Sequence, residues 1–159
     1  MKTQDKIKNR VEAKELVSKW KDAGDEVVFT NGCFDILHLG HVDYLEKARS
    51  LGNRLVLAVN TDASVKKLKG EHRPVNSEYA RARILAALNF VDLVMLFGED
   101  TPLELIEEIL PDILVKGKDY DASNIVGADV VIEHGGKVET ITLVAGYSTT
   151  GIIEKLKNK

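Results

Sequence analysis

The chain has 159 residues, of which 44% are hydrophobic and 30% charged, and its formal net charge is −3 at pH 7. This composition fits one globular domain, and the acidic balance argues against nonspecific nucleic-acid binding, which requires a basic face. No apolar run approaches the roughly eighteen residues of a membrane helix. The N-terminus is charged rather than basic and then apolar, and the single cysteine excludes an intramolecular disulfide. We therefore expect a cytoplasmic protein without membrane or nucleic-acid partners.

Helical and extended patterns alternate from the N-terminus onward. The spacing of apolar residues predicts a helix over Lys6–Ala23, followed by a strand over Val27–Asn31. A helix over His41–Leu51 and a strand over Arg54–Asn60 come next. We expect residues 1–25 to form an N-terminal helix packed on one domain made of residues 26–159.

The second half of the chain continues the same alternation. The polar and basic stretch Thr61–Asn76 is expected to be a loop with room for one helical turn, and Ser77–Phe90 is an amphipathic helix. Thr101, followed by Pro and Glu at the first and third helical positions, is expected to begin a helix that ends before Pro111. The remaining expected elements are strands at Val91–Phe97, Ile113–Lys116 and Val138–Leu143, a short helix around Ala128–His134, and a helix from Ser148.

Strands that alternate with helices indicate right-handed βαβ units, hence a parallel sheet with helices on both faces. In such α/β folds ligands bind beyond the carboxyl ends of the strands, at the point where the winding direction reverses. If the first strand is that switch strand, the loop after it faces the loop after the fourth strand. The stretch Thr30–Leu45 (TNGCFDILHLGHVDYL) would then lie opposite Lys116–Asp119.

The stretch Thr30–Leu45 allows several chemistries. The chain has neither a GxxxxGK[ST] nor a GxGxxG motif, so neither a P-loop NTPase nor a dinucleotide oxidoreductase is indicated. His38 and His41 suggest a zinc site, but zinc pairs on helices usually stand four residues apart and a structural site needs about four ligands. A nucleophilic Cys33 with a histidine base is a second possibility. A third is a turn that Asp35 caps, with both histidines merely half-buried.

Phosphate binding fits this stretch best. The start of a helix offers free N–H groups and a positive dipole end, Gly40 lets a phosphate approach the backbone, and imidazoles add donors. The cluster of Lys66, Lys67, Lys69 and Arg73 concentrates positive charge as a triphosphate requires, although a solvated basic loop would look the same. Gly146–Gly151 (GYSTTG) places hydroxyls at a second helix start, where they could equally be an ordinary cap.

Together, Gly32–Asp35 running into His38–His41 (HLGH), with Ser148–Thr150 before the last helix, resemble the HxGH-motif nucleotidyltransferase (cytidylyltransferase-like) family. From about Val27 onward the chain is most similar to the branch of adenylyltransferases that act on D-glycero-β-D-manno-heptose 1-phosphate, in a stand-alone form. The stretches that carry this similarity are FTNGCFDILHLGH, LAVNTDASVKKLKG with RPVN, GEDTPLELIEEILPDILVKGKDY and GYSTTGII.

The resemblance implies a Rossmann-like sheet of order 3-2-1-4-5, a homo-oligomer, and ATP with Mg²⁺ as cofactor. The implied reaction is in-line attack of the sugar phosphate on the α-phosphorus of ATP, which gives ADP-heptose and pyrophosphate without a covalent enzyme intermediate. Positioning and charge stabilisation would supply nearly all the catalysis. No protein side chain is assigned as a metal ligand.

The resemblance also assigns roles to residues of this chain. The catalytic positions are His38, His41, Lys67 and Arg81, the last two answering basic residues that draw charge toward pyrophosphate. The nucleotide-binding positions are Thr30, Asn31, Gly32, Cys33, Phe34, Gly40, His41, Lys116, Gly117, Ser148, Thr149 and Thr150. The substrate-binding positions are Asp35, Asn60, Asp62, Lys69, Arg73 and Asp119, where Asp35 either orders its loop or orients the substrate phosphate.

Two departures from the family pattern matter. Many relatives have Thr or Ser where this chain has Cys33. The cytidylyltransferase branch carries an arginine shortly before its Ser-Thr-Thr stretch, where this chain reads Leu143-Val144-Ala145. The alternatives are a cytidylyltransferase acting on a small alcohol phosphate such as glycerol 3-phosphate, and a catalytically silent nucleotide-binding module.

Overall fold

Five runs of aliphatic and β-branched residues form one sheet in the computed structural model, which describes residues 2–118, 121 and 124–159. Neighbouring strands are parallel, and their order is β3-β2-β1-β4-β5. This confirms the α/β class and the predicted strand order. The strands are β1 Val27–Gly32, β2 Arg54–Asn60, β3 Leu93–Phe97, β4 Ile113–Gly117 and β5 Lys137–Ile141.

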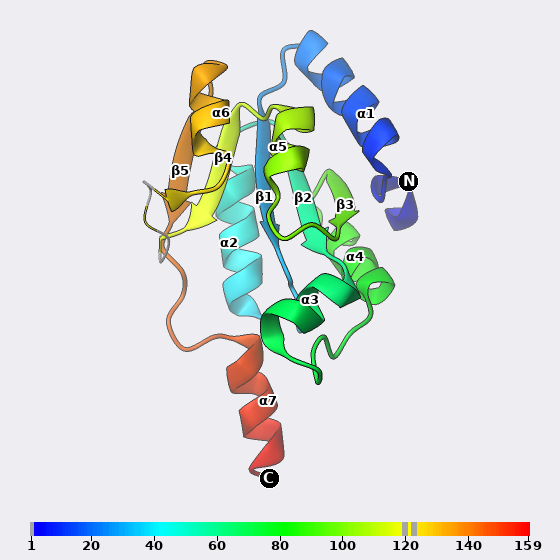
Figure 1. Cartoon of the computed structure of the whole chain (residues 1–159), viewed down its shortest axis with the longest axis vertical. Helices are drawn as coiled ribbons and strands as arrows, with labels where there is room; N and C mark the ends of the chain where they lie inside the picture. The colour runs from blue at the N-terminus through cyan, green and yellow to red at the C-terminus, as the bar shows by residue number, and fades with distance from the viewer. Residues whose placement is uncertain (1, 119–120, 122–123) are drawn as a thin grey trace.

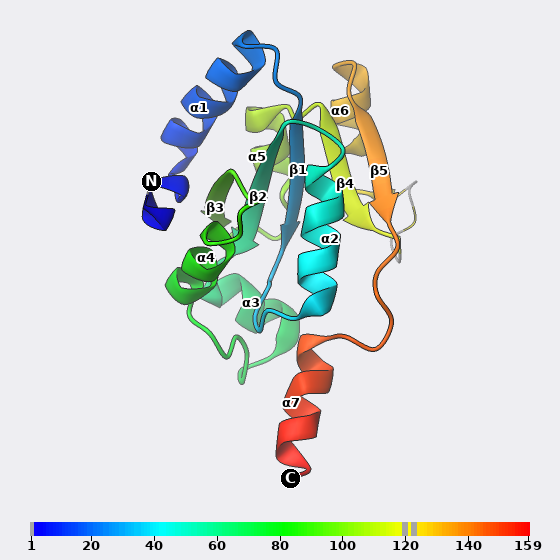
Figure 2. The same ribbon diagram turned by 180° about the vertical axis from the view of Figure 1, so that it is seen from behind.

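Helices cover both faces of the sheet (Figures 1 and 2). The buried side chains of α1, α5 and α6 join one hydrophobic cluster, and those of α2 and α4 join the cluster on the other face. The N-terminal helix is therefore part of the core of this domain. The helices are the 3₁₀ helix η1 Thr3–Lys6 and the α-helices α1 Arg10–Asp22, α2 Leu39–Arg49, α3 Asp62–Lys69, α4 Glu78–Ala86, α5 Leu103–Ile109, α6 Ala128–Glu133 and α7 Thr149–Lys157.

The central strands are buried on both faces. Along β1, Val27 and Phe29 point to the cluster under α1 and α5, whereas Val28 points to the cluster under α2 and α4. This alternation is the two-residue period of a strand, and full burial is usual for a parallel sheet covered by helices. The sheet reverses its winding between β1 and β4, so Gly32 and Gly117 end neighbouring strands at its carboxyl edge.

The stretch Thr61–Asn76, expected to be a loop with room for one helical turn, contains the eight-residue helix α3 in its first half. The prediction underestimated this helix, whereas the stretch from Gly70 to Asn76 is a connection as expected. Thr61 caps α3 by accepting a hydrogen bond from the Ser64 N–H at 3.3 Å, and Val65 is fully buried. The helix has few apolar residues because its outer face lies in water, so the pattern of polar residues concealed it.

Several predicted boundaries also shift. The first predicted helix is divided: η1 ends at Lys6, Ile7 pairs with Val94 at the edge of β3, and α1 begins after the Asn9 capping box. Helix α2 starts two residues earlier than expected and β3 two residues later. The physical reason for the first change is that the edge of β3 offers backbone partners that an unbroken helix could not use.

Helix α7 extends away from the body of the domain (Figure 1). None of its residues is buried, although it carries Ile152, Ile153 and Leu156. Among the helices of the described residues, none is long and apolar enough to cross a membrane.

Candidate active site

A cavity of about 630 Å³ opens at the carboxyl edge of the sheet, over the ends of β1 and β4. It lies at the switch point where the sequence predicted a ligand site. Sixteen of the predicted site residues line it: Asn31, Gly32, Cys33, Phe34, Asp35, His38, Gly40, His41, Asn60, Lys69, Arg73, Lys116, Gly117, Ser148, Thr149 and Thr150.

His38 and His41 lie together at the start of α2. Their rings stack with centroids 3.7 Å apart, and the Nδ1 atom of each is buried without a hydrogen-bond partner among the described residues. Burial, and then the neighbouring His38, lower the pKa of His41 from 6.5 to about 4, and burial also lowers the pKa of His38. Both rings are therefore neutral at pH 7, and each keeps one N–H that can donate to an oxyanion without a fixed charge.

Gly40 lies against these rings. A Cβ atom at this position would lie 3.0 Å from the His38 ring, which is tighter than most Cβ contacts, and 3.4 Å from the Cβ of Tyr147, which is an ordinary contact. The glycine therefore makes room for His38 as well as for a ligand near the backbone.

The start of α7 faces the same cavity. Ser148 caps the helix by accepting a hydrogen bond from the Gly151 N–H at 2.9 Å. The Thr149 hydroxyl lies 3.3 Å from the Ile36 carbonyl and 3.4 Å from the Ile36 N–H, which joins the start of α7 to the loop before α2. Two helix N-termini, 110 residues apart in the sequence by their first residues Leu39 and Thr149, thus converge on one cavity.

Lys116 brings a positive charge to the floor of the cavity. It is the fourth residue of β4, is only 9% exposed, and its Nζ donates to the side-chain oxygen of Asn31 on β1. Burial lowers the pKa of Lys116 from 10.5 to about 8. The ammonium group is therefore mostly charged at pH 7, in a place where an anion would compensate its burial.

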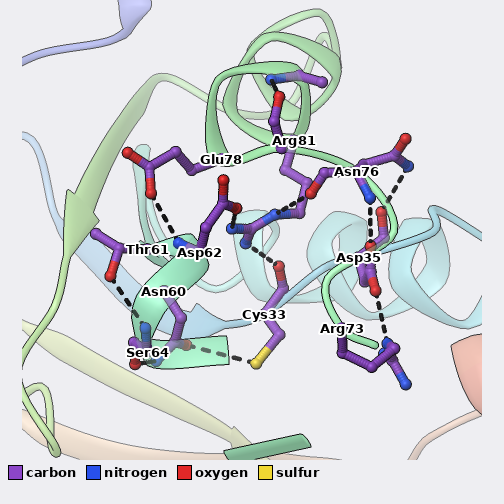
Figure 3. A network of polar contacts seen from close by, with 12 residues as sticks. Cys33, Asp35, Asn60, Thr61, Asp62, Ser64, Arg73, Asn76, Glu78 and Arg81 are labelled. Atoms are coloured by element: carbon purple, nitrogen blue, oxygen red, sulfur yellow. Dashed lines mark hydrogen bonds and ion pairs between the residues drawn. The ribbon is translucent and has the colours of Figure 1, made fainter. Parts of the chain in front are cut away.

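Asp35 orders the loop that holds Arg73. Its side chain is fully buried and accepts hydrogen bonds from the Val75 and Asn76 N–H groups at 2.9 Å and from Arg73 Nε at 2.7 Å (Figure 3). Burial raises the pKa of this carboxyl, but these bonds outweigh it and the pKa lies below its ordinary value. Of the two roles open for Asp35, the structure supports the ordering of the loop.

A cytidylyltransferase-like family model matches residues 29–155, which is most of the chain. The chain belongs to the cytidylyltransferase-like family. The resemblance read from the two motifs is thereby confirmed.

Curated relatives support the same family. The bifunctional protein HldE of Magnetococcus marinus is 59% identical over 152 residues, which are 96% of this chain and 31% of that protein. HldE of Campylobacter jejuni subsp. doylei is 57% identical over 154 residues, 97% of this chain and 32% of that protein. The chain thus spans about a third of the length of these relatives.

Solved structures show the same fold. The lipopolysaccharide core biosynthesis protein from Thermoplasma volcanium GSS1 superposes with a TM-score of 0.64 at 29% identity, covering 76% of this chain and 98% of that chain. Pantoate-β-alanine ligase from Francisella tularensis superposes with a TM-score of 0.59 at 12% identity, covering 95% and 76%, which shows the fold alone.

Four predicted residues of this cytidylyltransferase-like domain do not line the cavity. Thr30 is buried and bonded to the Tyr44 hydroxyl and the Val115 carbonyl. Lys67 is exposed and paired with Asp100. Arg81 is buried and paired with Asp62, so neither is placed for the direct ligand contact expected of it. A fifth predicted residue, Asp119, lies outside the described residues.

The cavity also contains residues that the sequence did not single out. Tyr147 stacks at 6.5 Å from the His38 ring, and Asp100 with Pro102 borders the cavity beyond β3. On the opposite side the wall is apolar: Ile125, Val126, Leu143 and Val144. Isolated apolar residues in loops carry no periodic pattern, so no signal in the sequence could assign them to this wall.

The proposed absence of a protein-held metal was an expectation from the family. The described residues contain no group of three or more His, Cys, Asp and Glu side chains that could hold a metal ion. Mg²⁺ that is bound together with a nucleoside triphosphate uses phosphate oxygens, water and only one or two carboxylates, so such a group is not required for it.

The stability of this domain should decrease as the pH falls from 6.5 toward 4. The pKa of His41 is about 4 in the folded chain and 6.5 when unperturbed, so in this window the unfolded state binds more protons than the folded state. Urea unfolding at several pH values would measure this slope. His41→Gln should make it shallower, whereas His134→Gln, which changes an exposed histidine on the far side of the sheet, should not. Equal slopes in wild type and His41→Gln would contradict the burial of a neutral His41.

Cys33 is not activated as a nucleophile. Burial raises the pKa of its thiol despite the nearby cations Lys69, Arg81 and Arg73. The Sγ atom lies 3.8 Å from Asn60 Oδ1, a weak contact, and within the described part of the chain no histidine is hydrogen-bonded to it. We therefore expect Cys33→Ser to keep kcat/KM within a few-fold of wild type, because a thiolate is what makes cysteine reactive. Loss of nearly all activity in a folded variant would restore the nucleophile hypothesis.

Proposed function

We propose that this domain transfers AMP from ATP to D-glycero-β-D-manno-heptose 1-phosphate and releases ADP-heptose and pyrophosphate. The observation that carries the proposal is the convergence of the HLGH and Ser148–Thr150 motifs, each at a helix N-terminus, on one cavity. The family supports nucleotidyl transfer, and the stretches shared with HldE relatives at 54–59% identity support the heptose substrate. ADP-heptose would serve as a precursor of the lipopolysaccharide core.

The lining of the cavity suggests how the ligands would lie. Neutral donors from His38 and His41 and the free N–H groups at both helix starts suit the phosphates of ATP. The apolar wall with Ile125 and Val144, beyond β4 and β5, suits the flat face of a base. On the opposite side, Arg73 suits the phosphate of the acceptor sugar and Lys69, at the end of α3, suits the triphosphate.

The reaction requires one displacement. A phosphate oxygen of the sugar attacks the α-phosphorus of ATP, the bond to the β-phosphate breaks, and its electron pair leaves with pyrophosphate. Both reactants are already ionised, so no proton has to be removed. The residues contribute by aligning the two phosphates and by stabilising the charge that develops on the transferring group. His38, His41 and Lys116 lie where they can supply this stabilisation.

Magnesium enters this proposal as part of the ATP complex. Mg²⁺ prefers phosphate oxygens, water and one or two carboxylates. When bound to ATP, the ion would neutralise phosphate charge. No step above depends on a protein ligand to it.

A panel of ATP, CTP, GTP and UTP against heptose 1-phosphate and glycerol 3-phosphate, read by pyrophosphate release, tests the function. We expect turnover with ATP and the heptose phosphate. Preferred use of CTP with glycerol 3-phosphate would overturn the substrate assignment, and binding of triphosphate without turnover of any pair would indicate a silent module. An α-thiophosphate centre should be inverted once, because a covalent nucleotidyl intermediate would give net retention.

A further inference from the structure

Arg81 is a charged side chain with no access to the cavity. It lies in the first turns of α4, is 1% exposed, and is the largest of the fully buried side chains. Its guanidinium donates three hydrogen bonds: to the Cys33 carbonyl at 2.7 Å, to the Asn76 carbonyl at 3.0 Å and to Asp62 Oδ1 at 2.9 Å (Figure 3). A buried cation is costly unless it is paired and bonded in this way, so the arrangement needs a reason.

The three partners of Arg81 belong to three different segments around the cavity. Cys33 is in the loop between β1 and α2, Asp62 is the first residue of α3, and Asn76 lies in the connection from α3 to α4. The same connection is held to the loop between β1 and α2 by Asp35, which accepts hydrogen bonds from the N–H groups of Val75 and Asn76. Arg81 and Asp35 therefore fix the connection and both of its neighbours from two sides (Figure 3).

The bond to Cys33 also fixes a strained part of the loop. Phe34 has φ +47°, a left-handed conformation that residues other than glycine rarely adopt and that persists only when the surroundings hold it. A trans peptide is planar, so a donor that binds the Cys33 carbonyl sets the orientation of the whole Cys33–Phe34 peptide. Cys33 and Phe34 line the cavity and Arg81 does not, so the guanidinium holds this peptide from the side away from the ligand.

The bond to Asp62 acts on the other wall. Asp62 begins α3, and its backbone N–H donates a hydrogen bond to Glu78 Oε2 of α4 at 2.7 Å. Because α3 is a short helix of eight residues, fixing its first residue also fixes the direction in which its last turn points. That last turn carries Lys69, which lines the cavity.

We propose that Arg81 is a positioning residue that holds the Cys33–Phe34 peptide and helix α3 in one fixed arrangement around the triphosphate. This inference rests on the proposed function. It replaces the direct pyrophosphate contact expected from the sequence with an action through Cys33 and Asp62. The three bonds leave from three different nitrogens of one rigid plane, Nε, Nη1 and Nη2, whereas a lysine has a single nitrogen that cannot reach all three partners.

A double-mutant cycle with Arg81→Lys and Asp62→Ala, which removes the acceptor of the Arg81 hydrogen bond, tests the proposal, with Arg83→Lys as matched control on the same helix. Titration calorimetry of MgATP well below Tm, together with kcat, would be measured for each variant. We expect each single change to weaken MgATP binding by about tenfold, the scale of one hydrogen bond to a charged group. The double variant should bind MgATP only slightly more weakly than the more impaired of the two single variants, since both changes release α3. Arg83, which bonds Tyr79 and Thr3 away from the cavity, should tolerate lysine without loss.

Two results would overturn the proposal. Arg81→Lys with normal affinity and kcat would show that charge alone suffices. A defect in Arg81→Lys with normal binding in Asp62→Ala would show that the hold on helix α3 contributes nothing, which contradicts the proposal. Should Arg81→Lys fail to fold, Asp62→Ala decides, because the Asp62 side chain is 41% exposed and its loss leaves no cavity in the core. Failure of heptose turnover in wild type would reject the substrate but leave the binding cycle interpretable.

Discussion

Replacing His38 or His41 by alanine should lower kcat by about a hundredfold or more, the usual scale for removing a donor that acts on the transition state. The rings stack at 3.7 Å and are neutral at pH 7, so each offers one N–H to the transferring phosphate. MgATP affinity should fall much less than kcat, because the free N–H groups at both helix starts remain. Because the rings support each other, the double alanine variant should lose less than the product of the single losses.

Turnover of the histidine variants should be measured by pyrophosphate release, with unfolding curves to verify the fold. His134→Ala is the matched control, since it removes an exposed histidine at the end of α6. Near-normal kcat in either His38→Ala or His41→Ala would refute the assignment of the phosphate site to the HLGH motif.

Lys116→Met should lower kcat/KM by about a hundredfold, again the scale of a lost electrostatic contact in a site shielded from water. Lys116 is 9% exposed as a residue, and it lies near the carboxyl edge of the sheet on β4, between β1 and β5. Its pKa of about 8 gives a second expectation: kcat/KM of wild type should decline as the pH rises through about 8, because the charged form lies below the pKa and the neutral form above it.

Two variants separate the charge of Lys116 from its shape. Lys116→Arg is charged at every pH tested and should lose the alkaline decline even where its activity is reduced by poor fit. Lys137→Met, at the opposite end of the sheet on β5, should leave both kcat/KM and its pH profile unchanged. A wild-type profile that stays flat to pH 9.5 would contradict a role for the charged form of Lys116 in binding.

The sequence predicted the secondary structure best where a strand is buried on both faces. The runs around Phe29, Leu57 and Leu114 are continuous and apolar because their strands are covered on both faces, and each was placed within a few residues. Helix α3 was underestimated for the opposite reason. It is short and largely polar and buries only Ser64 and Val65, so its few apolar residues did not stand out. Its cap at Thr61, the acidic Asp62 in its first turn and the lysines in its last turn were the local signals.

Charged residues were the least predictable part of the site. Lys67 and Lys69 stand two residues apart on α3, yet only Lys69 lines the cavity, because successive side chains of a helix point in different directions. For Asp35 the sequence left two roles open, the ordering of its loop or the orientation of the substrate phosphate, and its oxygens accept hydrogen bonds from a segment about 40 residues away in the sequence. Neither outcome can be read from local composition, since it depends on which backbone groups a distant segment brings near.

The sequence by itself determined the α/β class, the cavity-forming motifs at His38–His41 and Ser148–Thr150, and the family. Each of these can be recognised from residue types and their spacing along the chain. Only the tertiary structure decided which cations face the ligand and which support the walls. Arg81 and Arg73 both lie near the loop after β1. Arg81 is buried and donates to the Cys33 carbonyl, whereas Arg73 lines the cavity. That difference arises because α3 and α4 pack against the loop after β1. Each guanidinium then binds the polar groups that this packing brings within its reach.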